Sequence, residues 1–422
     1  MKKWFSMFFA LAFGVISAMT GCSANKRKGG LILWWISGRE NEKLIAETVE
    51  AYTEQHPGTQ VEIVTKAGMD VFQAYKIALS DDNTRPDVAI LDHVYVQSLA
   101  KDGMIANLSE LGAADTRDAY PQGLWQANLY TENAYALPLS ANTIALMYNE
   151  NILKEAGVTV DGTTTGEADP PETLEELYAA CAKVKAIGKT PFAQPINSFA
   201  AMTFMSYVGR LGGTIVSDDY KTVLIDGNPQ VKKALEIWKK FSDEGWINKN
   251  EFEEGKFYSG GIAFLEMGSW NISRVSGTDA VFDVGVTEMV RFDKEHENVS
   301  GLGLYSLVVA EQSVDKQAAY ELAKYLSTNE AFQLKFNQSQ NLFPVIKTAL
   351  ADDYYANDSI LSVYAAQMEK VVPRPGTPVW PDLEQVLVTT LRSAVLRGDV
   401  DAALATAQRD AQAATNRIYG VA

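Results

Sequence analysis

Tryptophans and carboxylates near the ends of predicted strands are the side chains whose type and position suggest chemistry in this sequence. The chain holds eight Trp residues, and each offers a flat apolar face with one polar handle. A sugar presents the complementary surface, because its apolar ring face is bordered by hydroxyl groups. Trp270 follows a Gly-Ser pair at a strand end, and Trp380 lies between two prolines. Of Trp34 and Trp35, which must face opposite sides of a strand, Trp35 is nearer the carboxyl end and is the candidate.

Charged and polar residues follow the predicted strands as well. Asp92 comes directly after a buried strand, where its carboxylate either accepts two hydroxyl hydrogen bonds or caps the next helix. His93 either donates to the same ligand or lies at the surface. Arg39 and Glu40 follow the first strand and form either a ligand contact or an exposed salt bridge.

Enzymatic motifs are weak in this sequence. The three His residues, His56, His93 and His296, lack metal-ligand spacing, and only two Cys are present, so neither a metal nor a cofactor is predicted. No nucleophile elbow or phosphate-binding loop is found. A glycosidase needs only two carboxylates, and the chain has 53 acidic residues. Residue types alone therefore leave glycoside hydrolysis open.

The elements that must position these side chains alternate between strands and helices. Apolar runs predict strands at Leu31–Ile36, Val61–Val64 and Val88–Leu91, and helical spacing predicts helices at Glu40–Gln55 and Val71–Leu79. This alternation predicts an α/β fold with a mostly parallel sheet and helices on both faces. In such sheets the ligand lies beyond the carboxyl ends of the strands. That rule points to Ser37–Glu40 and Asp92–Tyr95.

One stretch predicts a crossing between two such units. Tyr135–Glu150 contains two short apolar runs separated by the polar residues Ser140, Asn142 and Thr143. Runs of this length indicate buried strands, and a second series of strands and helices follows. We expect the chain to leave one lobe here and enter another, with the polar side chains exposed in the gap.

Length and charge limit the possible classes of protein. The chain of 422 residues exceeds what one core usually organises, so two domains are expected. Its 47% hydrophobic and 21% charged residues are typical of a globular protein. The net charge of −16 argues against a partner such as nucleic acid, which requires clustered Lys and Arg.

The N-terminus has the pattern of an export signal. Two Lys precede an apolar run at 4–16, which is too short to span a bilayer but suits a signal peptide. Small residues then lead to Gly21-Cys22 and resemble a bacterial lipobox, in which Cys22 would carry lipid. Residues 1–21 would be removed, and 22–30 would form a polar tether. The other thiol, Cys181, lies on an apolar helical stripe and is expected to be buried.

Taken together, several motifs resemble those of the family 1 extracellular solute-binding proteins of ABC transporters, and they span nearly the entire mature chain. They occur in the family's order at Leu31–Trp35, Pro86–Asp92, Tyr135–Pro138, Leu146–Asn149, Pro171–Leu177, Gly261–Trp270, Phe343–Ala349 and around Trp380. The resemblance implies two α/β lobes around a ligand cleft. One lobe would combine 31–139 with 307–350, and the other 145–302 with 356–422. The hinge would lie near 139–144, 303–307 and 350–356.

The resemblance also implies roles for particular side chains. Trp270 and Trp380 match positions where the family places aromatic rings against the ligand. Asn142 matches a position where maltose-binding members carry a carboxylate, so an amide there implies a different hydrogen-bond pattern. Arg374 is a further candidate contact in the last segment.

The implied function is that of a substrate-binding lipoprotein of an ABC importer. It would capture a mono- or oligosaccharide, act as a monomer without enzymatic activity, and deliver the sugar to permease subunits. It would be exported and anchored by its lipid at the outer face of the cell membrane or in the periplasm. The alternatives are a binding protein for a polyamine or an organic anion and a secreted glycoside-processing enzyme.

Overall fold

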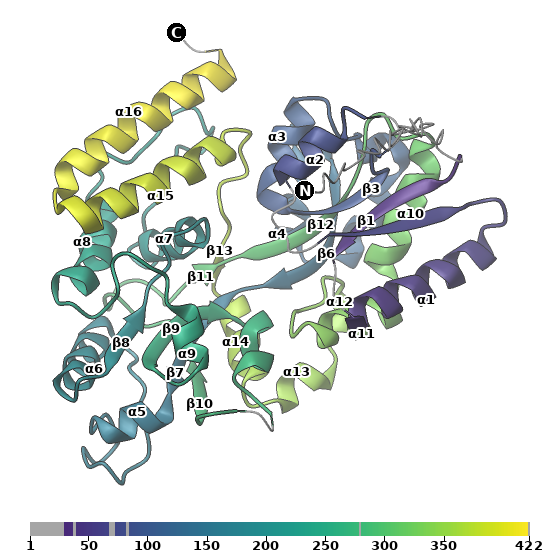
Figure 1. Ribbon diagram of the computed structural model, residues 1–422. Helices are drawn as coiled ribbons and strands as arrows, with labels where there is room; N and C mark the ends of the chain where they lie inside the picture. Colours follow the sequence, from purple (N-terminus) through teal and green to yellow (C-terminus); the bar gives the residue numbers. More distant parts are fainter. Residues whose placement is uncertain (1–28, 37–38, 67–71, 82–83, 278–279, 421–422) are drawn as a thin grey trace, which may run out of the picture.

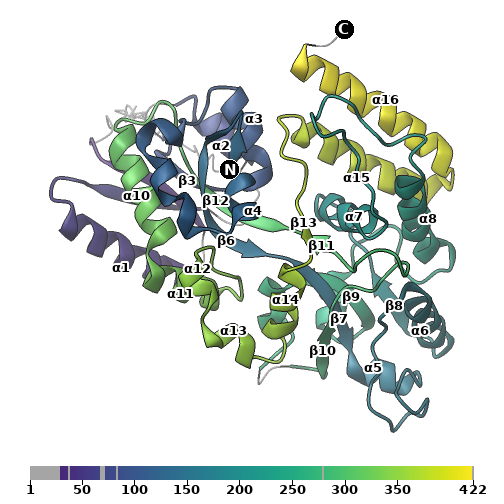
Figure 2. The ribbon, with the colours of Figure 1, turned by 180° about the vertical axis from the view of Figure 1, so that it is seen from behind.

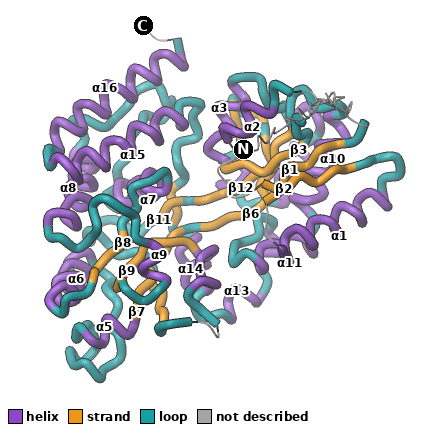
Figure 3. The backbone as a smooth tube through the Cα atoms, viewed as in Figure 1, coloured by secondary structure: helices purple, strands orange, loops and turns teal. Residues whose placement is uncertain are grey.

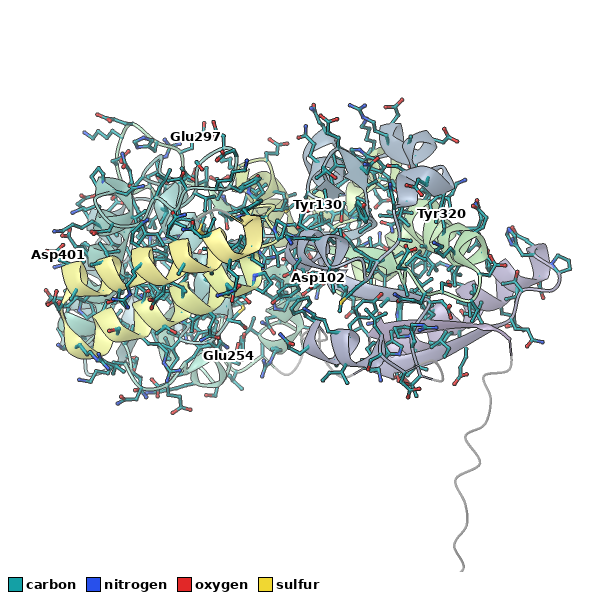
Figure 4. The ribbon with its side chains drawn as sticks, turned by 90° about the horizontal axis from the view of Figure 1, so that it is seen from above. Asp102, Tyr130, Glu254, Glu297, Tyr320 and Asp401 are labelled. Atoms are coloured by element: carbon teal, nitrogen blue, oxygen red, sulfur yellow. The ribbon has the colours of Figure 1, made fainter. Side chains whose placement is uncertain are left out.

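The described part of the chain forms two lobes joined at a waist. The computed structural model describes residues 29–36, 39–66, 72–81, 84–277 and 280–420. Both side views show the two lobes (Figures 1 and 2), and from above Tyr320 and Asp401 lie on different lobes (Figure 4). We call the lobe with the first strand the N-terminal lobe and the other the C-terminal lobe. The predicted signal peptide and Cys22 lie outside the described residues.

A five-stranded sheet organises the N-terminal lobe (Figure 3). Its strands lie in the order β2 (Val61–Lys66), β1 (Leu31–Ile36), β3 (Val88–Asp92), β12 (Gly303–Val309) and β6 (Ala136–Asn142). β1 is parallel to β2 and β3, whereas β12 is antiparallel to its neighbours β3 and β6. Leu33 and Trp35 of β1 pack on one side of the sheet, and Ile32 and Trp34 pack on the other. The prediction that this strand is buried on both faces is confirmed.

Helices cover both faces of this sheet. One face packs against α1 (Arg39–Gln55), α10 (Lys316–Thr328) and α11 (Glu330–Ser339), and the other against α2 (Phe72–Ala78) and α3 (Val96–Lys101). The lobe also contains the short elements α4 (Gln122–Gln126), α12 (Lys347–Leu350), β4 (Leu129–Tyr130), β5 (Asn133–Ala134) and the 3₁₀ turns η1 (His93–Tyr95), η2 (Leu108–Leu111) and η3 (Ala113–Ala119).

A four-stranded sheet organises the C-terminal lobe. Its strands lie in the order β10 (Val284–Thr287), β7 (Ile144–Asn149), β9 (Ile262–Gly268) and β8 (Thr190–Ala193). β8 is parallel to β9, whereas β7 is antiparallel to β9 and β10. Around this sheet lie α5 (Glu150–Glu155), α6 (Leu174–Ala186), α7 (Phe199–Gly209), α8 (Pro229–Asp243), α9 (Glu254–Tyr258), α14 (Leu361–Met368), α15 (Trp380–Arg397), α16 (Val400–Tyr419) and the turn η4 (Ser269–Arg274). α13 (Asp353–Asn357) connects α12 to α14.

Local sequence signals place several of these helices. The Asn228 side chain accepts hydrogen bonds from the backbone N–H groups of Gln230 and Val231, as a helix cap does. Thr173 and Glu176 form a reciprocal capping box at the start of α6. On the inner face of that helix, the Cys181 side chain is fully buried. The prediction that Cys181 is buried is therefore confirmed, and this burial raises the pKa of its thiol.

Each sheet has one strand that runs against the others, and the chain enters that strand directly from the other lobe. β7 follows β6 across the waist, and β12 follows β11 (Ser300–Gly301), which pairs with β13 (Val371–Val372). The remaining strands of both sheets therefore end at the waist. Asp92 of β3 pairs with Tyr305 near the start of β12, and Gly268 of β9 pairs with the first residue of β7. The carboxyl ends of two sheets thus face the same gap.

The waist is drier than the sequence indicated. Ser140, Asn142 and Thr143 are all at most 3% exposed, so the expectation of exposed polar side chains is wrong. The reason is that two of these side chains have buried hydrogen-bond partners, Thr143 in the other crossing segment and Ser140 in α11. The Thr143 hydroxyl donates to the Gly301 carbonyl over 3.1 Å, and the Ser140 hydroxyl donates to Asn337 over 2.5 Å.

The second crossing lies slightly earlier in the chain than 303–307. Gly303 already pairs with Asn142 in the five-stranded sheet, so the passage falls between β11 and β12. The third passage runs from α12 to α14, where the Tyr364 hydroxyl donates to the Met267 carbonyl of β9. The exact residue boundaries of the lobes stay a prediction.

The Ser300 hydroxyl provides a test of this dry waist. It donates to the Ile144 carbonyl over 2.8 Å and accepts from the Ile144 N–H over 3.3 Å. Ser300→Ala removes this side-chain partner from two buried backbone groups and should lower the free energy of unfolding by about 1–3 kcal/mol. Denaturant unfolding measures this change.

Ser306→Ala is the matched control. Ser306 is equally buried, but within the described residues its hydroxyl has no hydrogen-bond partner. Removing it should change the stability little. Equal losses in the two variants would contradict the role given to Ser300.

Candidate functional site

A cavity of about 200 Å³ opens between the lobes, and we call it the interlobe cleft. Its lining residues come from the ends of β3, β6 and β9, from the start of β12, from the start of α7 and from the segment around α15. They are Asp92, Tyr95, Asn142, Ser198, Phe199, Met202, Trp270, Gly303, Leu304, Tyr305, Arg374 and Glu384. The cleft thus lies beyond the carboxyl ends of strands in both sheets, where ligands bind in folds of this kind.

An ion pair between Asp92 and Arg374 forms the charged part of the cleft. One guanidinium nitrogen of Arg374 donates to both carboxylate oxygens of Asp92, each over 2.8 Å. Arg374 lies two residues after β13 and is 6% exposed. Burial alone would raise the pKa of Asp92, but the Arg374 charge and hydrogen bonds from His93 and Arg374 outweigh it and lower the pKa to about 2. The carboxylate is therefore charged at any pH above this value.

His93 supports Asp92 from behind. Its Nδ1 lies 3.0 Å from Asp92 Oδ1 and 3.1 Å from the Leu304 carbonyl oxygen, and the residue is 1% exposed. Both earlier alternatives, a ligand donor and a surface residue, are wrong, because the imidazole is buried against Asp92 and the Leu304 carbonyl and does not line the cleft. The Asp92 side chain makes no helix-capping hydrogen bond either.

A second polar contact joins the lobes beside this ion pair. The Tyr95 hydroxyl donates to Glu384 Oε2 of α15 over 3.0 Å. The Tyr95 ring stacks on Phe72 with their centroids 4.2 Å apart. Burial and the neighbouring carboxylates of Glu384 and Asp92 raise the pKa of Tyr95. The hydroxyl therefore remains protonated and can serve as a donor.

Apolar side chains of the C-terminal lobe form another part of the cleft lining, which we call the apolar wall. Trp270 of η4 lies edge-to-face with Phe199 of α7, with ring centroids 6.1 Å apart and planes at 88°. Met202, one turn further along α7, continues the wall. The cleft is therefore lined both by an aromatic surface and by hydrogen-bonding groups.

Four of the nine predicted contact residues meet in the cleft. These are Asp92, Asn142, Trp270 and Arg374. Arg39 and Glu40 begin α1, but their side chains lie outside the described part of the chain, so both stay predictions.

Trp35 and Trp380 are core residues, and their predicted contact with the ligand is wrong. Trp35 is 1% exposed and packs against both Phe332 and Phe336 of α11, with ring centroids 5.9 and 5.3 Å away. Trp380 is 0% exposed in the core of the C-terminal lobe, and the Arg374 guanidinium lies 6.0 Å from its ring centre. Helices cover both faces of β1, so neither Trp34 nor Trp35 lines the cleft, and position along the strand could not predict this.

Other residues of the cleft carried no signal in the sequence. Phe199, Met202 and Glu384 belong to amphipathic or apolar helices, and only the packing of the lobes brings the ends of these helices together. Tyr95 was indicated only as part of the segment that follows β3. Among the described residues, no group of three His, Cys, Asp or Glu side chains could hold a metal ion. In the same part of the chain, none of the helices has the length and hydropathy to cross a membrane.

Two α/β lobes around a cleft at the ends of their strands define a binding protein of the two-lobed class. The chain belongs to a family described as bacterial extracellular solute-binding protein, whose model matches residues 47–362. It is a member of an exported family that serves ABC transporters, and its curated relatives are binding proteins.

The relatives and solved structures agree on the fold. The maltotriose-binding protein of Pyrococcus abyssi is 24% identical over 90% of this chain and 82% of its own length. The galactooligosaccharide-binding protein of Bacillus subtilis is 22% identical over 90% and 91%. The GacH receptor of Streptomyces glaucescens, solved unliganded and with acarbose, superimposes with a TM-score of 0.76 at 22% identity and covers 92% of this chain and 98% of its own.

The ion pair of the cleft predicts a pH dependence of stability. The pKa of Asp92 lies below the value of about 3.9 found in unfolded chains, so the pair stabilises the fold fully above that value. Its contribution of about 2 kcal/mol is lost as the pH falls towards 2. Unfolding free energies measured between pH 5 and pH 2 should fall more steeply for the wild type than for Asp92→Asn. Identical slopes would contradict the pairing.

Proposed function

We propose that this protein captures a sugar, either a mono- or an oligosaccharide, in the interlobe cleft for an ABC importer. The observation that carries the proposal is the mixed lining of the cleft, in which the apolar wall of Trp270 and Phe199 is combined with a polar wall formed by the Asp92–Arg374 pair and Asn142. A sugar ring placed against Trp270 would direct its hydroxyl groups towards the polar wall. The relatives named for maltotriose and galactooligosaccharides support the same class of ligand.

The charges of the cleft favour a neutral ligand over the other two candidates. A polyamine requires several converging carboxylates, whereas the cleft lining has two, of which Asp92 is paired with Arg374 and Glu384 accepts a hydrogen bond from Tyr95. An organic anion requires an available cation, and both hydrogen bonds from the Arg374 nitrogen go to Asp92. Hydroxyl groups can join such a pair without breaking it, because the carboxylate accepts and the guanidinium donates several bonds.

Capture would shift the population of open and closed lobes. The hinge of this motion would be formed by the three passages of the chain, near 139–144, near the start of β12 and near 350–356. The closed monomer would then deliver the sugar to permease subunits in the membrane. Release and not hydrolysis would follow, so incubation with maltotriose should yield no shorter product.

Calorimetry against maltotriose, a galactooligosaccharide and an arabinooligosaccharide tests the proposal. We expect one of these to bind with a Kd of about 1 μM, which corresponds to about −8 kcal/mol. Trp270→Ala should weaken that binding about tenfold or more, because the ring supplies the apolar wall.

Tyr354→Ala is the control for this substitution, because Tyr354 is 41% exposed and does not line the cleft. Its affinity should equal that of the wild type. An unchanged affinity in Trp270→Ala would exclude Trp270 as the sugar platform, and polyamine binding without sugar binding would exclude the sugar class.

The lipid anchor at Cys22 completes the proposal. Export and lipidation would tether residue 22 to the outer face of the membrane through the 22–30 segment. Cells fed a labelled fatty acid should incorporate it into the wild-type protein and not into Cys22→Ala, which should leave the membrane fraction. Label retained in Cys22→Ala would contradict the assignment.

A further inference from the structure

Two glycines lie directly beneath the side chains that shape the interlobe cleft. Gly268 ends β9, and the six-membered ring of Trp270 lies over its α-carbon. Gly303 begins β12 and pairs in register with Asn142 of β6, whose amide lies over it. One glycine thus supports the aromatic wall, and the other supports the polar wall.

The backbone does not require glycine at either position. Gly268 has φ −88° and ψ 163°, an extended conformation that any residue adopts. Gly303 is likewise absent from the described glycines that have positive φ. In contrast to glycines such as Gly398, which ends α15 with φ 82°, these two cannot be explained by turn geometry.

Space explains them instead. A Cβ built on Gly268 would lie 1.7 to 2.2 Å from three carbon atoms of the Trp270 ring. A Cβ on Gly303 would lie 2.0 Å from Asn142 Oδ1 and 2.7 Å from Asn142 Cγ. Contacts this short cannot be tolerated, so a single methyl group at either position must move the side chain above it. The Trp270 ring also has Phe199 beside it and lines the cleft, so any movement of the ring changes the cleft lining.

We propose that Gly268 and Gly303 are positioning residues that set how far Trp270 and Asn142 project into the interlobe cleft, and so set the width available to the ligand. The ligand part of this inference rests on the proposed function. The positioning part concerns the protein without ligand and is tested separately.

The four-stranded sheet that contains Gly268 also provides a control glycine, which distinguishes a positioning role from a general packing effect. Gly285 of β10 pairs with Tyr148 of β7, and a Cβ on Gly285 would lie 2.1 to 2.4 Å from the end of the Tyr148 side chain. Neither residue lines the cleft. Gly285→Ala therefore introduces a comparable clash in the same sheet, away from the ligand.

Fluorine NMR of fluorotryptophan-labelled protein without ligand tests the positions directly. The Trp270 resonance is assigned from its loss in Trp270→Phe. Gly268→Ala should shift this resonance and leave those of the other tryptophans in place, whereas Gly285→Ala should leave Trp270 unchanged. A Trp270 resonance that is unmoved in Gly268→Ala, or moved equally in both variants, would overturn the proposal.

Binding measurements with maltotriose then test the consequence for affinity. Gly268→Ala should weaken binding about tenfold, and it should cause no further loss in the Trp270→Ala background, because the displaced ring is then absent. Gly303→Ala should behave in the same way towards Asn142→Ala. A loss of the same size in both backgrounds would show a general structural effect and contradict positioning.

Failure of the proposed function and failure of the positioning role give different results. If the wild type does not bind maltotriose, that ligand is removed from the proposed function, while the fluorine spectra still decide the positioning role. If Gly268→Ala fails to fold, the double variant with Trp270→Ala should fold, because it relieves the clash. Failure of the double variant as well would overturn the proposal.

Discussion

The structure depends on two chain segments that cross a dry waist side by side. Backbone groups in such a place need partners as much as those in a core do, yet the sheet of neither lobe extends across the gap. Ser300 and Thr143 supply the missing bonds by contacting the backbone of the opposite segment. Because each hydroxyl binds across the crossing, the two segments are held in one register. Asn142 and Gly303, which border the cleft, are close in sequence to these contacts, so the contacts fix their positions.

Topology then converts the crossing into a site. The strand entered from the other lobe runs against its neighbours, so the parallel strands of both sheets end at the waist. Asp92, Asn142 and Trp270 each stand at or just after such an end. Their convergence needs no local motif, which explains why residues from opposite lobes and distant parts of the chain share one cavity. The Asp92–Arg374 ion pair and the Tyr95–Glu384 hydrogen bond then join elements of the two lobes.

Sequence reasoning succeeded where a single element carried the information. The alternation of strands and helices and the buried Cys181 both follow from local pattern. Asp92, Asn142 and Trp270 could be predicted because strand ends are visible in sequence and the family motifs cover them. His93, Trp35 and Trp380 could not, since their exposure depends on which helix covers them, and that is decided by packing. Glu384 and Phe199 lie on helices whose ends meet the cleft only after the lobes are assembled.

The place of β12 has a consequence for how the chain folds. This strand lies between β3 and β6 in the N-terminal lobe, but it is synthesised only after β7 to β11 of the other lobe. Until then the first sheet lacks the strand that joins β6 to β3, and α10, α11 and α12 are also missing. Domains usually fold as units in the order of synthesis, but here the first lobe cannot be completed before most of the second has been made. Pairing strands that are so far apart in the sequence is slow because of the loop entropy that is lost. The N-terminal lobe of the newly made chain therefore remains incompletely folded for longer than the first of two consecutive domains would.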